Sequence, residues 1–369
     1  MNTILKSTCF LFCFFYFGFI FSQYPNPIPV VKDSAMLKVV AKKSIKMQAA
    51  PTNPIPINKE KQKTQSKPQT ICNQRTTAAI DPNLGVNFLA NELPANVSPP
   101  DNNIAVSDAG YIVTVDNRTI EYYKTDGTNL LAWETLENFF NDVTLSQNDF
   151  FDPRIIYDPI SDRFIFVVIN GVDVDHNIIA LAFSKTDNPV DGWNKDYRIV
   201  GNSFEPTFWM DQPRIGISED ELFISGAMSS DGVAQGHSSL IQLGLQEGYN
   251  NDPLDYVFWT NFSSIPIIAP ASFGQDGFYG PGLLMVGTMP SGDNRVYLFQ
   301  VTGQRNTPST QILAYTIPCT PYSPGADANQ LGNADLLDVP DCRVQNAFYL
   351  RNRFKRVSWG IIHTRLSIR

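Results

Sequence analysis

A short motif that recurs along the chain constrains its fold more than any other feature. Aspartate, proline and arginine lead into a β-branched apolar run at Asp152-Pro153-Arg154-Ile155, and again about sixty residues later at Asp211-Gln212-Pro213-Arg214-Ile215. A weaker copy, Asp341-Cys342-Arg343-Val344, follows after about two more such intervals. A fixed period of this length is typical of stacked supersecondary units. The sequence therefore predicts a repeat architecture.

Each repeat reads as short strands joined by turns. After the motif at Asp152, the residues Asp158 to Asp162 have turn chemistry, because Asp and Ser bond their own backbone and Pro presets φ. Aromatic and β-branched residues flank this turn, and a further strand is expected at Asn177 to Ser184. We predict an all-β fold of about five blades, each with three or four antiparallel strands, arranged as a β-propeller. A pair of β-sandwiches is the alternative.

The chain divides into three regions by composition. Residues 1–22 carry one charge, Lys6, and a short apolar run, which predicts a secretory signal cleaved after Ser22; a membrane anchor is the alternative. Residues 23–80 hold ten basic and two acidic residues and are rich in Pro, Gln and Thr, which favours a disordered leader or linker. Residues 81–369 form the propeller-like domain.

The charge balance of residues 81–369 restricts the class of partner. This region holds 17 basic and 34 acidic residues, which argues against nucleic acid as a ligand. No further transmembrane segment is expected in the mature chain, so we predict a secreted or cell-surface protein, with the periplasm as an alternative. Basic residues dominate after Asp341, where a last blade should complete the ring. We favour a ring truncated at the C-terminus over one that this basic segment closes.

Three cysteines remain after the predicted signal. Cys319 and Cys342 could close a loop of about two dozen residues, which would stabilise an exported protein by roughly 3 kcal/mol. Cys72 lies in the leader and is expected to be unpaired. The spacing of the three matches no zinc site.

Carboxylates at the blade starts are the strongest candidates for catalysis. Glycoside hydrolysis needs two carboxyl groups, one with a raised pKa. Asp101, Asp152 and Asp211 open successive repeats, and Glu205 is the candidate acid. However, a residue that recurs in every repeat favours a structural role, in which the aspartate pairs with Arg154, Arg214 or Arg343 or caps a turn. The repeat motif (Asp152, Arg154, Asp211, Arg214, Asp341 and Arg343) is therefore interpreted as structural.

One loop has the alternation of an oxygen-ligand site. Asp173, Asp175 and Asn177 could hold Ca²⁺, but the glycine and distal glutamate of an EF-hand are missing. A plain hairpin loop is the favoured interpretation, and no cofactor or metal is otherwise expected. The clustered aromatic residues suit packing between blades or stacking on sugar rings.

Several segments together resemble a group of exported bacterial repeat proteins of propeller type. They include Pro99 to Val106, Asp152 to Asp158, the run from Ser184 to Trp193, Asp211 to Gly216 and Ser358 to Thr364. Such proteins are distantly similar to sialidases and often carry a C-terminal domain for type IX secretion. The resemblance implies the fold and export. The arginine triad and tyrosine nucleophile of a sialidase have no counterpart in this chain.

Two classes of function follow from these patterns. The first is an exported noncatalytic binding or surface protein whose ligand is a glycan or a protein. The alternative is a glycoside hydrolase or lyase that uses the carboxylates at the blade starts. A purely structural role is the third interpretation.

Overall fold

The fold is all-β. The computed structural model describes residues 31–32, 37–38, 88–91, 101–126, 130–146, 149–201, 205–230, 233–263, 265–273, 282–324, 344, 347–351 and 357–360. Within these ranges the α-helices are short, and antiparallel strands form four sheets of at least four strands. The predicted signal and most of the leader lie outside the described residues.

The first two sheets each contain four strands in chain order. The first sheet has the order β3-β4-β5-β6 and the second β7-β8-β9-β10 along its path. The bounds of their strands are β3 Asn103–Val106, β4 Tyr111–Val115, β5 Thr119–Lys124, β6 Ala132–Thr135, β7 Phe150–Asp158, β8 Arg163–Asn170, β9 Ile178–Ser184 and β10 Trp193–Val200. Helix α1 (Leu136–Phe140) follows the first sheet, and a 3₁₀ turn (Pro189–Asp191) precedes β10.

The third and fourth sheets have the same chain order and gain extra strands. Their bounds are β11 Trp209–Ile217, β12 Glu221–Ser230, β13 Val233–Gly244, β14 Asp255–Ser263, β15 Ile268–Phe273, β16 Leu283–Gly287, β17 Asp293–Val301 and β18 Ile312–Tyr322. Helix α2 (Leu245–Asn250) joins β13 to β14. β19 (Ala347–Arg351) pairs in parallel with β15, and β20 (Val357–Gly360) pairs with β19.

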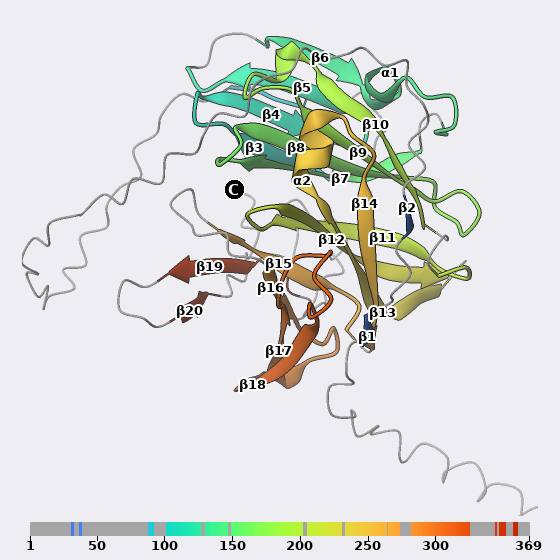
Figure 1. The fold of residues 1–369 in the computed structure, drawn as a ribbon, viewed down its shortest axis with the longest axis vertical. Coiled ribbons are helices and arrows are strands. Elements are labelled where there is room, and N and C mark those ends of the chain that lie inside the picture. The colour runs from blue at the N-terminus through green and yellow to red at the C-terminus, as the bar shows by residue number, and fades with distance from the viewer. Residues whose placement is uncertain are drawn as a thin grey trace, which may run out of the picture.

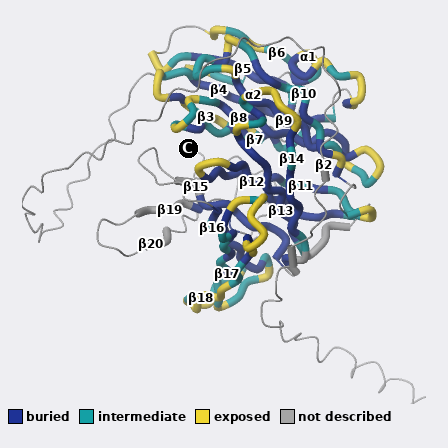
Figure 2. Tube along the Cα trace, viewed as in Figure 1, coloured by how far each residue is buried: buried dark blue, intermediate teal, exposed yellow. Residues whose placement is uncertain are grey.

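The four sheets follow one another round an arc, from β3–β6 to β15–β18 (Figure 1). The first strand of each sheet contacts the first strand of the next: β3 contacts β7, β7 contacts β11, and β11 contacts β15. Separate apolar clusters fill the spaces between sheets one and two, two and three, and three and four. The strand faces that neighbouring sheets turn toward each other are therefore buried, while exposed residues gather at turns (Figure 2). This radial packing of four-stranded sheets is the β-propeller predicted from the repeat.

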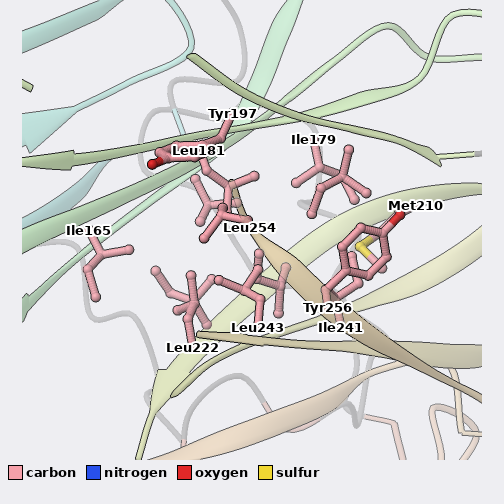
Figure 3. Close-up of a cluster of buried hydrophobic side chains, with 14 of the residues drawn as sticks. Ile165, Ile179, Leu181, Tyr197, Met210, Leu222, Ile241, Leu243, Leu254 and Tyr256 are labelled. Atoms are coloured by element: carbon pink, nitrogen blue, oxygen red, sulfur yellow. The ribbon is translucent and has the colours of Figure 1, made fainter. Parts of the chain in front are cut away.

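The cluster between the second and third sheets shows why the pair of β-sandwiches is excluded. Ile165 and Leu181 of the second sheet meet Leu222 and Leu243 of the third, and all four are fully buried (Figure 3). The opposite face of the second sheet packs on the first sheet, and that of the third on the fourth. Two separate sandwiches would instead leave each sheet with one solvent-exposed face.

Helix α1 packs between the first two sheets, and helix α2 packs against the second. Phe139 and Phe140 of α1 belong to the core between the first two sheets, and Thr135 caps the helix by accepting a hydrogen bond from the backbone of Asn138. Gly248 of α2 lies so close to Phe183 that a Cβ there would stand 2.5 Å from the ring. Close contact between α2 and β9 therefore requires glycine at this position.

Two short segments of the predicted leader take part in the fold. β1 (Val31–Lys32) and β2 (Leu37–Lys38) pair antiparallel with β14, at the outer edge of the third sheet. These four residues are therefore paired strands, and the rest of the predicted leader, 23–80, lies outside the described residues. In the described part of the chain, no helix is long and apolar enough to cross a bilayer.

Candidate functional site

The motif residues form a local backbone device at the starts of the first three sheets. Asp101, Asp152 and Gln212 have φ values of 45°, 51° and 49°, in the left-handed region that aspartate tolerates better than most residues. In β7 and β11 the device coincides with a β-bulge, between Phe151 and Arg154 and between Asp211 and Arg214. A bulge re-aims side chains.

Hydrogen bonds from this device join neighbouring sheets. The carboxylate Oδ2 of Asp152 accepts from the backbone N of Gln212 at 3.1 Å, and Nε of Arg154 donates to the carbonyl of Pro213 at 2.8 Å. One sheet earlier, Oδ1 of Asn103 accepts from the backbone N of Ile155 at 2.8 Å. The charged groups of the second sheet thus satisfy the backbone of the third.

The carboxylates of three sheets interact at this point. We call Asp101, Asp152, Asp211, Arg154 and Arg214 the axial cluster. Burial raises the pKa of Asp152 and the charge of Asp101 raises it further, while the two arginines and a side-chain hydrogen bond with Asp211 oppose this shift without cancelling it. Burial also lowers the pKa of Arg154, against the opposing effect of the nearby carboxylates. Asp101 in addition accepts a hydrogen bond of 2.8 Å from Asn117.

Glu205 lies apart from the axial cluster, in the connection between β10 and β11. Its carboxylate accepts hydrogen bonds from His237 at 2.8 Å, Ser239 at 2.7 Å and Thr260 at 2.5 Å. Burial alone would raise the pKa of Glu205, but these three donors outweigh it and the pKa lies below its usual range. A general acid needs the opposite shift. The contacts tie the connection to β13 and β14.

Replacing Glu205 by glutamine should destabilise the protein in a pH-dependent way. Because the pKa of Glu205 is lowered in the folded protein, its contribution is present above the unfolded pKa of about 4.3 and is lost as the pH falls through the folded value. Thermal melts of wild type and Glu205→Gln should therefore differ at neutral pH and converge in acid. A constant difference at every pH would contradict this role.

In the loop proposed for Ca²⁺, the side chains of Asp173 and Asn177 form hydrogen bonds with other protein atoms. Oδ1 of Asp173 accepts from the backbone N atoms of Asp175 and His176, both at 2.9 Å, and the carboxylate also contacts the ring Nδ1 of His176. Asn177 is buried and bonds to backbone atoms of Gly171 and Met210. The side chains of Asp173 and Asn177, two of the three candidate ligands, thus have other partners. Across the described residues, no group of three or more His, Cys, Asp and Glu could hold a metal ion.

The structure describes only part of the remaining candidates. Asp341, Cys342 and Arg343 lie outside the described residues. Cys319 is a half-buried free thiol on β18, and the bond predicted between it and Cys342 stays a prediction because Cys342 lies outside the described residues.

The run from Ser184 to Trp193 forms a self-contained turn. Oγ of Ser184 donates to the carbonyl of Thr186 at 2.7 Å, and Nε1 of Trp193 donates to the carbonyl of Pro189 at 3.1 Å. Trp193 itself packs on Tyr122 of the first sheet and on Phe139 of α1. This supports packing between blades, one of the two roles considered for the aromatic residues, as the role of Trp193.

One charged network was missed by the sequence analysis. Glu221 at the start of β12 accepts from Arg305 and Gln242, and Arg305 also pairs with Glu247. The network joins the loop after β17 to the third sheet. Its partners are distant in sequence, and no repeat or spacing marks them.

The comparisons with known proteins found weak structural likeness. No family model matches, and no curated protein matches. Among solved structures, the chain is similar to a subtype N10 neuraminidase-like protein of A/little yellow-shouldered bat/Guatemala, with 12% identity, TM-score 0.34 and 57% of each chain covered. It is also similar to an exo-β-1,3-galactanase from Clostridium thermocellum (12% identity, TM-score 0.32, 58% of this chain and 48% of that chain). A third is a Cellvibrio cellulosa α-L-arabinanase (15%, 0.30, 59% and 69%).

Proposed function

We propose that this protein is an exported, noncatalytic binding protein of propeller type whose ligand is a glycan or a protein. The observation that carries the proposal is that charged side chains of the axial cluster form hydrogen bonds between neighbouring sheets. Asp152 and Arg154 both bond to the backbone of the neighbouring sheet, so the recurring charges hold sheets together. Secretion or display on the cell surface rests on the apolar segment at residues 1–22.

The spacing of the carboxylates supports a binding role over hydrolysis. Asp211 is close enough to Asp152 for a hydrogen bond between them to hold down the pKa of Asp152. Glycosidases hold their two carboxyl groups roughly 5 to 9.5 Å apart to admit the sugar and a nucleophile or water. Carboxyl groups in direct hydrogen bond are too close for this arrangement. Glu205, the other candidate acid, has a lowered pKa.

A glycoside hydrolase or lyase is the second candidate, because one observation favours it. The pKa of Asp152 is raised by burial and by Asp101, which is the environment of a general acid. Asp101 would then be the second carboxylate. The distance between this pair and a bound sugar decides whether such chemistry can occur.

A single screen separates the two functions. The full chain is incubated with mixed polysaccharides and sialosides, and both retention and released sugar are measured. We expect retention without turnover. Turnover that falls by about 10² to 10⁴ in Asp152→Asn would establish the enzyme and overturn the binding proposal. Asp191→Asn, in the self-contained turn before β10, is the control for a nonspecific effect of losing a carboxylate.

A further inference from the structure

The edge strands of the first sheet, β3 and β6, carry exposed apolar residues on one face of the sheet only. Val113 and Ile120 point toward the second sheet and are fully buried. The pairing of β3 with β4 and of β5 with β6 sets Ile104, Val106 and Trp133 on the opposite face. These three side chains are 59%, 43% and 55% exposed. We call this the outer face of the first sheet.

The repeat shows that such exposure is unusual for this position. Ile104 and Ile155 each stand three residues after the aspartate that opens their sheet, and Ile215 is the equivalent residue after the inserted Gln212. Ile155 packs against the first sheet and is 2% exposed, and Ile215 packs against the second and is 9% exposed. The position is buried wherever another sheet precedes it. Among the described residues, no sheet precedes the first.

Val344 marks the same position in the last copy of the motif. It stands three residues after Asp341, is 2% exposed, and packs with Ala269 and Val286 of the fourth sheet. Its backbone N donates to Oγ1 of Thr288 at 2.8 Å. Val344 therefore relates to the fourth sheet as Ile155 relates to the first. β19 and β20 follow, and β19 lies beside β15, the first strand of the fourth sheet.

We propose that the outer face of the first sheet is the docking surface for a fifth sheet of this same chain, which begins at Val344 and includes β19 and β20. The apolar contacts between sheets one to four then continue across a fifth interface of the same kind and close the ring. β19 and β20 already lie at the end of the arc of sheets, next to β15 (Figure 1).

Polar groups on the outer face do not oppose this docking. Glu121 is buried there and accepts hydrogen bonds from the backbone of Asn91 and from the hydroxyl of Tyr123. The ring of Phe88 packs at a tilt against that of Tyr123, with the ring centroids 5.0 Å apart. The residues around Phe88 thus satisfy the one carboxylate in the centre, and apolar side chains remain to meet the fifth sheet.

The test compares two double variants of the full chain. Ile104→Thr with Val106→Thr makes the outer face polar and keeps the β-branched shape that strands favour. Val172→Thr with Val190→Thr is the control, because these valines are similarly exposed, at 53% and 50%. We expect the first variant to lower Tm by about 5 °C, since hydroxyl groups would be buried in the interface, and the control to change it little.

Hydrogen exchange and the size of the protein in solution then identify what covers the outer face of the first sheet. In the first variant, exchange should rise in residues 344–360 as well as in β3, whereas a general loss of stability would raise it in β8 and β12 equally. Equal melting of the two double variants, with unchanged exchange in 344–360, would overturn the proposal. A wild type that is a dimer in solution and becomes monomeric in the first variant would also overturn it, because a second copy would then cover the face.

Discussion

Replacing Arg154 by alanine is expected to destabilise the protein by about 3 kcal/mol, because it leaves buried charge without its partner. The guanidinium donates to the carbonyl of Pro213 in the next sheet and offsets the charge of Asp152. Both interactions cross or flank the boundary between two sheets. Urea unfolding measures the loss. Affinity for the ligand found by the screen, measured well below the melting temperature, should change little.

Two further variants show whether the loss of stability depends on the position of the arginine or only on the loss of a positive charge. Arg214→Ala should act in the same direction, although the hydrogen bonds of 3.2 Å that its guanidinium makes end on Gln212 and Pro213 of its own strand. Arg163→Ala is the control, since Arg163 bonds carbonyls of its own turn. If Arg154→Ala or Arg214→Ala unfolds like wild type but loses ligand, the axial cluster is a binding site and its structural role is wrong.

Replacing Arg305 by alanine should have an effect of similar size, about 3 kcal/mol, at the boundary of the third and fourth sheets. A guanidinium nitrogen of Arg305 lies 3.3 Å from Oε1 of Glu221. The Arg305 side chain is 9% exposed and that of Glu221 is 1% exposed. Burial already raises the pKa of Glu221, against the hydrogen bonds from Arg305 and Gln242. Without the guanidinium the carboxylate stays buried with less compensation, so its pKa should rise further.

The pH dependence of Arg305→Ala gives the sharper measurement. A carboxyl whose pKa is raised on folding stabilises the protein when protonated, and this stability is lost as the pH rises through the folded pKa. The difference between variant and wild type should therefore grow with rising pH and shrink in acid. Arg295→Ala is the control, because its partner Asp293 lies in the same strand and the pair is partly exposed. A difference that is independent of pH would contradict a role through Glu221.

Local chemistry explains why the strands could be predicted from the sequence. The turn expected at Asp158 to Asp162 separates β7, which ends at Asp158, from β8, which begins at Arg163. The strand expected up to Ser184 is β9. Both depend on residues close together in the chain. The succession of the second and third sheets followed from the repeat, because the copies of the motif at Asp152 and Asp211 lie at their first strands.

The candidate site was predictable only where the repeat marks it. The aspartate and arginine of the motif could be identified, but not their partners, since Arg154 bonds a carbonyl 59 residues away. Glu205 was considered as an acid because of its residue type, and only the structure shows the three donors that lower its pKa. The network of Glu221 and Arg305 spans 84 residues, and nothing in the sequence relates its members.

The pairing of β1 and β2 with β14 has a consequence for the order of folding. Lys38 lies opposite Asp255, so more than two hundred residues separate the two sides of this contact. A contact of such high sequence separation forms slowly, because a long loop must close first. During synthesis β1 and β2 therefore remain unpaired until the third sheet exists. Between the formation of that sheet and the pairing of β1 and β2 with it, β14 presents an open edge, so this is the stage of biogenesis at which the chain is most exposed to wrong strand partners.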